Sequence, residues 1–192
     1  ILFCKGLHWT ERLLDRGFRS PWVRVLAGSV LLIGMSLLTN GDYNGAGMDV
    51  IARALAGEAD GWAWLLKILF TAVTIGCGFK GGEVVPSFFV GAAFGCFMGG
   101  LLGLPAGFGG AMGLPAGFGA AIGLVAVFCG AVNCPVASVL LSVELFGSAG
   151  APYFAVACAL SYLLSGYCGL YSSQTILYSK LRAEFINVRT HE

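Results

Sequence analysis

The chain has 192 residues, of which 57% are hydrophobic and only 11% are charged, and its formal net charge is +1. Soluble proteins carry about 25% charged residues, so this composition, with a mean hydropathy of +0.84, excludes an ordinary soluble protein. The sequence has no basic patch interleaved with aromatic residues, so we expect no nucleic-acid partner. No charged residue lies between Val84 and Val143 or between Leu145 and Ser179. A membrane span needs about 20 apolar residues, so we predict an all-α, polytopic membrane protein of short, tilted and broken helices.

The first part of the chain is predicted to hold one full span. Residues 1–20 mix basic side chains with leucines, which is typical of a helix end followed by an interfacial loop. Ser20-Pro21 is a helix start signal, and a span is expected over Pro21–Leu38. A turn-rich loop at 39–47 then leads to a helix over Met48–Ala56, which is too short to cross a membrane.

The centre of the chain is a polar, glycine-rich break between two apolar helices. The first helix is expected to run from Trp62 to Ile75, which is short for a full span. The break follows at 78–83 and contains a lysine and a glutamate. Pro86 suits the first turn of the next helix, because its missing N–H is not needed there. The free N–H groups of a helix start carry a partial positive charge that attracts anions, so this break is the candidate site.

The helix after the break is expected to end near Leu102, and its Gly91, Gly95 and Gly99 recur at every fourth position. This spacing lines one helix face with glycine and favours close packing against a neighbouring helix. A short tandem repeat follows within residues 103–122. We interpret it as a local duplication that lengthens a loop.

The rest of the chain is predicted to contain four helices with two breaks. The helices are expected over 116–129, 136–146, 152–167 and, as a final amphipathic helix, 172–185. The breaks are Asn133-Cys134-Pro135 and residues 169–173. Glu144 lies in the last turn of its helix, where it is either a proton relay or a helix-end residue near the interface.

Charge placement predicts an orientation in the membrane. Basic residues cluster at 5–24 and 180–189, and the positive-inside tendency places both clusters at the cytoplasmic face. The seven cysteines show no Cys-x-x-Cys spacing, and His8 and His191 lie at opposite ends of the chain. We therefore expect buried free thiols, no metal site and no cofactor.

Three stretches, in order, carry a resemblance to a known family. Residues Gly81 to Pro86 are similar to a Gly-x-Phe-x-Pro filter segment, and residues 133–145 are similar to a helix that ends in an acidic residue at a dimer contact. Residues 169–172 are similar to the start of a last helix whose tyrosine hydroxyl faces the anion. Together they resemble the CLC anion channels and proton-coupled anion antiporters. Val84 stands where the family has a phenylalanine. A glutamate at the position of Glu83 resembles the bacterial branch of the family that exports fluoride.

The resemblance implies that residues 1–192 form the C-terminal half of a CLC-type transmembrane domain. The N-terminal half, which holds the family's gating glutamate, is absent, and a chain that begins at Ile1 is expected to be a fragment. The implied function is transport of chloride or fluoride by a channel or a proton-coupled antiporter. The implied assembly is a homodimer through helices 136–146 and 152–167 in a bacterial plasma membrane, with the C-terminus cytoplasmic.

The expected anion pathway uses backbone groups more than side chains. N–H groups near Val84 and Val85 and the Tyr171 hydroxyl are expected to contact the anion, while protonated Glu83 donates a hydrogen bond. Lys80 either raises the local anion concentration or snorkels to the interface. A Glu83–Lys80 pair that caps the break, and an interfacial role for Tyr171, are open alternatives. The pathway residues are Gly81, Gly82, Glu83, Val84, Val85, Pro86 and Tyr171.

Two other classes of membrane protein are alternatives to a halide transporter. A membrane-embedded enzyme needs a nucleophile–base pair or a metal cluster, but the apolar core has no histidine and the chain has no Gly-x-Ser-x-Gly. We therefore expect no enzymatic activity. A structural membrane subunit without transport activity is the alternative, although a charged break between apolar helices is costly unless it is used.

Overall fold

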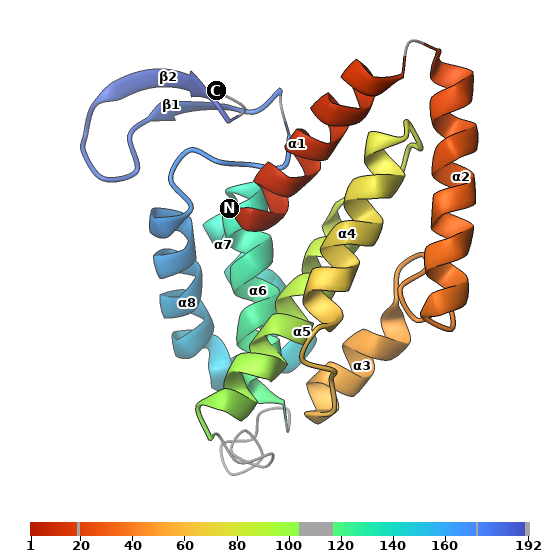
Figure 1. The fold of residues 1–192 in the computed structure, drawn as a ribbon. Helices are drawn as coiled ribbons and strands as arrows, with labels where there is room; N and C mark the ends of the chain where they lie inside the picture. The colour runs from red at the N-terminus through yellow and green to blue at the C-terminus, as the bar shows by residue number, and fades with distance from the viewer. Residues whose placement is uncertain (19, 104–116, 172, 191–192) are drawn as a thin grey trace.

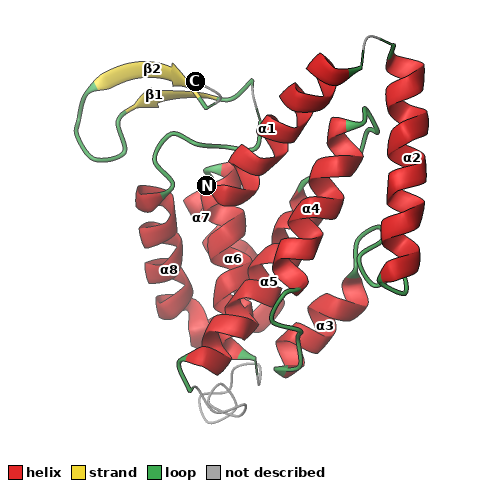
Figure 2. Cartoon of the chain, viewed as in Figure 1, coloured by secondary structure: helices red, strands yellow, loops and turns green. Residues whose placement is uncertain are grey.

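The computed structural model describes residues 1–18, 20–103, 117–171 and 173–190. Within these ranges the chain forms a bundle of α-helices, followed by a small β-hairpin at the C-terminal end (Figures 1 and 2). The helices are α1 (Leu2–Gly17), α2 (Pro21–Leu38), α3 (Met48–Ala56), α4 (Ala63–Gly76), α5 (Val84–Leu101), α6 (Phe118–Val132), α7 (Pro135–Phe146), the 3-10 turn η2 (Ser148–Gly150) and α8 (Ala151–Leu164). The strands are β1 (Thr175–Tyr178) and β2 (Phe185–Arg189).

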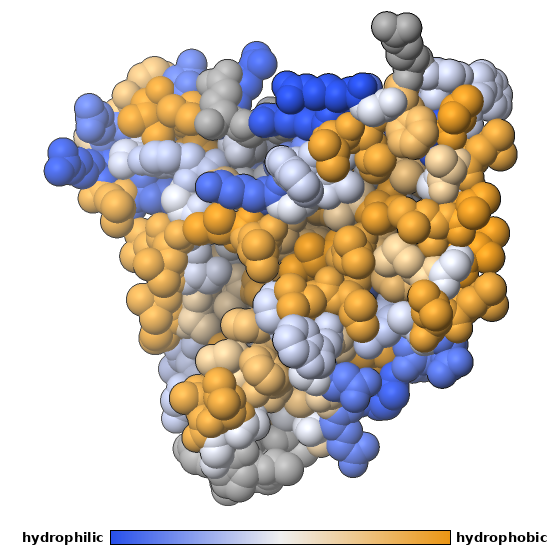
Figure 3. All heavy atoms as spheres, viewed as in Figure 1, coloured by the Kyte–Doolittle hydropathy of each residue, from blue (hydrophilic) through white to orange (hydrophobic). Residues whose placement is uncertain are grey.

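The surface has the banded character of a membrane protein. In Figure 3 hydrophobic residues form a broad central band, and hydrophilic residues gather at the end near the hairpin and at the opposite lower rim. Among the described helices, α2 and α5 are long and apolar enough to cross a membrane, and α4, α6 and α7 are shorter apolar helices. The two termini lie in the same half of the molecule (Figure 1).

Helices α5 and α6 form the most extensive contact among the described elements. Glycines from both helices meet at this contact, so the two backbones touch. A Cβ atom at Gly119 would lie 2.7 Å from the Gly95 carbonyl oxygen, and one at Gly91 would lie 2.8 Å from the Leu124 Cα. The glycine face expected from the four-residue spacing is therefore confirmed as a packing surface.

Most of the predicted helices are confirmed, with ends that shift by a few residues. The bounds of α2 and α3 agree with those predicted, and α5 begins two residues before Pro86. Residues 2–17 form a longer helix than expected, and it buries one apolar side against α4. The left-handed backbone of Asn133 (φ 59°) ends α6, as the Asn-Cys-Pro break predicted. The repeat at 103–122 lies largely outside the described residues.

The prediction of a final amphipathic helix over 172–185 is wrong, because this region forms the β-hairpin. Strands β1 and β2 pair antiparallel with Thr175 opposite Arg189 and Tyr178 opposite Phe185. The register shifts in between, where Asn187 takes a positive φ of 46° and gives β2 one extra residue. Both strands are rich in β-branched and aromatic residues, which favour pleated backbone. That local preference prevails over the amphipathic helix predicted for this segment.

The backbone contact between α5 and α6 predicts a steric effect that depends on position. We expect Gly95→Ala to destabilise the full-length protein by about 1–3 kcal/mol, because the added methyl overlaps the Gly119 backbone and neither backbone can give way cheaply. The measurement is the thermal unfolding temperature in detergent.

Gly100→Ala in the same helix is the matched control. A Cβ atom at Gly100 meets nothing within 4 Å, so we expect no loss there and a gain of up to about 1 kcal/mol from helix propensity. Equal unfolding temperatures for the two variants would contradict the packing argument.

Candidate functional site

The break between α4 and α5 is built from the end of one helix and the start of the next. Helix α4 ends at Gly76, and the Gly78 N–H donates to the Ile75 carbonyl at 2.9 Å. Gly78 has a φ of +94°, a conformation that side chains rarely adopt. The Arg24 guanidinium of α2 lies against this turn, 3.1 Å from the position of a Cβ atom. The chain then runs through Gly81 and Gly82 to α5.

The start of α5 presents unpaired N–H groups. The first amide of the helix to find a backbone partner is that of Ser87, which donates to the Glu83 carbonyl at 3.2 Å. Within the part of the chain that the structure describes, the amides of Val84 and Val85 donate to no backbone carbonyl. Pro86 is buried and has no N–H to satisfy. These free donors and the aligned helix dipole make a positive partial charge at the break.

A cavity of about 520 Å³ lies on one side of the break. Its walls are Leu32 of α2, residues 43–46, one face of α4, and the α5 start with Gly81, Gly82, Val85 and Pro86. A Cβ atom at Gly81 or Gly82 would meet nothing within 4 Å. Open space therefore adjoins Gly81 and Gly82, just before the start of α5.

Lys67 of α4 also lines this cavity and was not singled out by the sequence analysis. Its side chain is only 2% exposed. Its Nζ donates to the Tyr43 carbonyl at 3.0 Å and to the Gly45 carbonyl at 2.6 Å, and lies 4.9 Å from the centre of the Phe89 ring. The sequence did contain a signal for Lys67, because it is a single charged residue within an otherwise apolar helix. A charge in such a helix is costly and usually has a function.

Glu83 lies on a different side of the break from the cavity, whose lining does not include it. The charges of His8 and Glu11 on α1 act on its half-buried carboxyl. Burial raises the pKa of Glu83, Glu11 raises it further, and His8 opposes both. The capping pair of Glu83 with Lys80 is not formed, since the ion pairs among the described residues are Asp15–Arg24 and Asp42–Arg53.

The chain is similar in sequence and in fold to known proteins. Residues 1–166 match the family model for voltage gated chloride channels. The chain belongs to this CLC family. It is 38% identical over 187 residues to a chloride/fluoride channel protein of Pseudomonas syringae pv. tomato, covering 94% of this chain and 39% of that protein. A crystal structure of a CLC-type fluoride/proton antiporter superposes with a TM-score of 0.78 at 30% identity, over 88% of this chain and 41% of that one. The chain therefore spans about two fifths of these relatives.

Tyr171 of this CLC chain lies in the loop before the hairpin and not at the start of a helix. Its side chain is 41% exposed, and it is not part of the cavity lining. Its carbonyl accepts a hydrogen bond from the Thr190 hydroxyl at 2.6 Å. The preceding residue, Leu170, donates its amide to the Ala131 carbonyl at 2.8 Å. Of the predicted pathway residues, the cavity lining therefore includes Gly81, Gly82, Val85 and Pro86, but not Glu83, Val84 or Tyr171.

Asn133 joins the second and third of the CLC-like stretches. Its side-chain amide donates to the Cys168 carbonyl at 3.1 Å, just before Leu170 and Tyr171. Its side-chain oxygen accepts from Lys180, whose Nζ also donates to the Tyr162 carbonyl and the Ser165 hydroxyl, both at 2.9 Å. This network fixes the loop that carries Tyr171 to the ends of α6 and α8.

The Asn133 network predicts a graded loss of stability. We expect Asn133→Ala to destabilise the full-length protein by about 1–3 kcal/mol, because buried donors and acceptors lose their partner. Asn133→Gly loses the same bonds but relieves the left-handed backbone, so its loss is expected to be smaller by about 1 kcal/mol. Chemical denaturation in detergent measures both, and an alanine variant as stable as the glycine variant would remove the backbone part of the argument.

Proposed function

We propose that the full-length protein transports halide ions across a membrane and that the start of α5 forms part of its anion pathway. The observation that carries this proposal is the pair of free amides at Val84 and Val85, which follow Gly81 and Gly82 of the cavity lining along the chain. It is supported by the similarity to a chloride/fluoride channel protein and to a CLC-type fluoride/proton antiporter. Tyr171 stays in the proposed pathway on the family resemblance alone.

Partial charges suit this task better than a full charge. An anion that leaves water needs replacement for its hydration shell, but a fixed cation in contact with it would hold it too tightly for rapid passage. Backbone N–H groups at a helix start offer a weaker attraction. They also leave side-chain identity free, which is consistent with Val84 in place of the family's phenylalanine.

Glu83 is the residue that favours fluoride and a coupled proton in this proposal. When ionised, it repels an anion at the start of α5, whereas the protonated form donates a hydrogen bond to a strong acceptor such as fluoride. Burial raises the pKa of Glu83, so protonation occurs at a higher pH than for an exposed carboxyl. Lys80 is exposed in this chain and acts at most by attracting anions electrostatically.

A test of the Glu83 role uses the full-length protein in liposomes, with fluoride and chloride efflux recorded together with proton movement. We expect the wild-type fluoride flux to fall as pH rises through the raised pKa of Glu83, by up to about tenfold per pH unit, because ionisation removes the donor and adds repulsion. Glu83→Gln stays neutral at every pH, so its flux is expected to show a flatter pH profile and to lose proton coupling.

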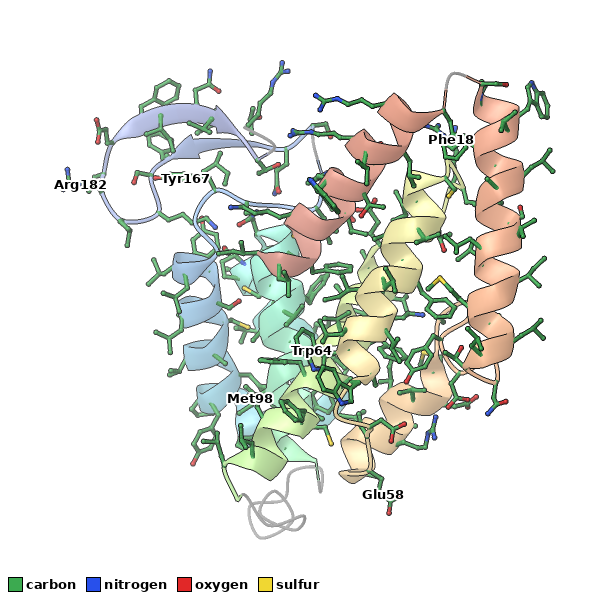
Figure 4. All side chains as sticks on the ribbon, viewed as in Figure 1. Phe18, Glu58, Trp64, Met98, Tyr167 and Arg182 are labelled. Atoms are coloured by element: carbon green, nitrogen blue, oxygen red, sulfur yellow. The ribbon has the colours of Figure 1, made fainter. Side chains whose placement is uncertain are left out.

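Glu58→Gln is the matched control for this test. Glu58 is an exposed carboxylate at the opposite end of the molecule from Phe18 (Figure 4), and we expect its loss to leave the pH profile unchanged. If the protein prefers chloride and Glu83→Gln keeps the wild-type pH profile, Glu83 has only a structural role. The absence of any halide flux would favour the structural-subunit alternative.

We also propose a homodimer formed through α7 and α8. Large apolar side chains of both helices, among them Val136, Leu140, Val156 and Leu160, are exposed in the isolated chain. A shallow hollow between the helices is lined by Val136, Val139, Leu140, Ala155 and Ala159, among others. Helix α7 belongs to the stretch 133–145, for which the family resemblance implies a dimer contact.

The dimer proposal predicts that bulk on this face separates the subunits. The double variant Leu140→Trp with Leu160→Trp is expected to shift full-length protein from dimer to monomer, because the added rings keep the two faces apart. Light scattering after size exclusion in detergent measures the mass. Leu26→Trp on the exposed side of α2 is the control, and a dimer that persists in the double variant would rule out this interface.

We place the protein in the bacterial plasma membrane with its C-terminus in the cytoplasm. Both termini lie in the same half of the molecule (Figure 1), and the basic clusters at 5–24 and 180–189 belong to that half. Arg182 and Phe18, labelled in Figure 4, lie toward this end, and Glu58 lies at the other. The positive-inside tendency then assigns the end with the hairpin to the cytoplasm.

A further inference from the structure

The cavity beside the break follows one whole face of α4. Lys67, Thr71 and Thr74 line it at intervals of four and three residues, the spacing that aligns side chains along a helix. The loop at 43–46 also lines the cavity, as do Gly81 and Gly82. The two threonine hydroxyls donate to the Lys67 and Phe70 carbonyls, at 2.8 and 2.7 Å, so these donors are already engaged.

Lys67 is the one cationic side chain among the described residues of this lining. An ammonium has three N–H donors, and two of them go to the Tyr43 and Gly45 carbonyls. Within the described part of the chain, the third has no oxygen acceptor, although the Phe89 ring lies beside the ammonium.

No carboxylate balances this charge from within the cavity. None of the described lining residues is acidic. Asp42 is the acidic residue next to the loop at 43–46 in the sequence. It is exposed and forms an ion pair with Arg53 at 2.7 Å. A buried charge with only carbonyl dipoles and one aromatic face around it is costly, and a mobile anion in the cavity would offset that cost.

We propose that Lys67 is an anion-binding group, which forms a second halide station in the cavity between α2, α4 and α5. This inference rests on the proposed function and extends it. The first station is the pair of amides at the start of α5, and the second is the Lys67 ammonium near the loop at 43–46. The carbonyl bonds and the Phe89 ring weaken the hold of the ammonium on its anion, which lets the ion leave.

The alternative role for Lys67 is purely structural, as an anchor that holds the loop at 43–46 against α4. Stability alone does not separate the two roles, because both lose something when the lysine is replaced. Halide affinity does separate them, because an anchor has no direct effect on the concentration of halide that half-saturates transport.

The first experiment measures halide flux by the full-length protein in liposomes at a series of fluoride and chloride concentrations. We expect Lys67→Met to raise the half-saturating concentration at least about tenfold, the change that corresponds to loss of a charge-assisted hydrogen bond. Lys67→Arg keeps the charge and is expected to restore most of the affinity. Arg53→Met removes a cation from outside the cavity and is expected to leave the half-saturating concentration unchanged.

The second experiment detects the ion directly and does not depend on transport. Crystals of the full-length protein grown with bromide are expected to show an anomalous peak within hydrogen-bond distance of the Lys67 Nζ. The same peak is expected in Lys67→Arg and not in Lys67→Met. Bromide is the probe because it scatters anomalously and carries the same charge as the proposed substrates.

The outcomes separate this inference from the proposed function. If bromide binds at Lys67 but the protein transports no halide, the anion site at Lys67 is supported and the transport proposal is overturned. Halide transport without bromide at Lys67, and with unchanged half-saturation in Lys67→Met, would overturn the station alone. If Lys67→Met fails to fold, the wild-type bromide peak and the Lys67→Arg flux still decide the question, and an empty wild-type cavity overturns the inference.

Discussion

The direct contact between the backbones of α5 and α6 is the constraint on which the rest of this structure depends. Apolar side chains gain little by leaving lipid for a protein interior, so helices in a membrane associate through close van der Waals contact. Gly91 and Gly95 allow that contact with Gly119 and Gly123, where any side chain would overlap a backbone atom. The contact holds α5 in a fixed direction, and its N-terminal amides are consequently presented at a fixed place.

Charges are distributed around that helix start on separate sides. Glu83 faces the charges of α1, whereas Lys67 lies in the cavity bounded by α2 and α4. An acid and a base that met directly would form a pair and neutralise each other. Kept apart, the two groups do not neutralise each other.

The local pattern of the sequence predicted the helices well because each has a strong local signal. Ser20-Pro21 starts α2, and the glycine-rich break separates α4 from α5. The C-terminal segment was predicted wrongly because the β-branched and aromatic residues of its two strands, which favour strand backbone, were given too little weight. Lys67 was passed over because its significance lies in the Tyr43 and Gly45 carbonyls, which are more than 20 residues away along the chain.

The sequence by itself determined that this is a helical membrane protein, and most of the positions where its helices begin and break. These properties follow from hydropathy, proline and glycine, which act over a few residues. Only the tertiary structure decided that Glu83 and Lys67 lie on different sides of the break, that Lys80 is unpaired with Glu83, and that Tyr171 lies outside the cavity. Distances between segments remote in the chain depend on how the helices pack, and no local pattern encodes them.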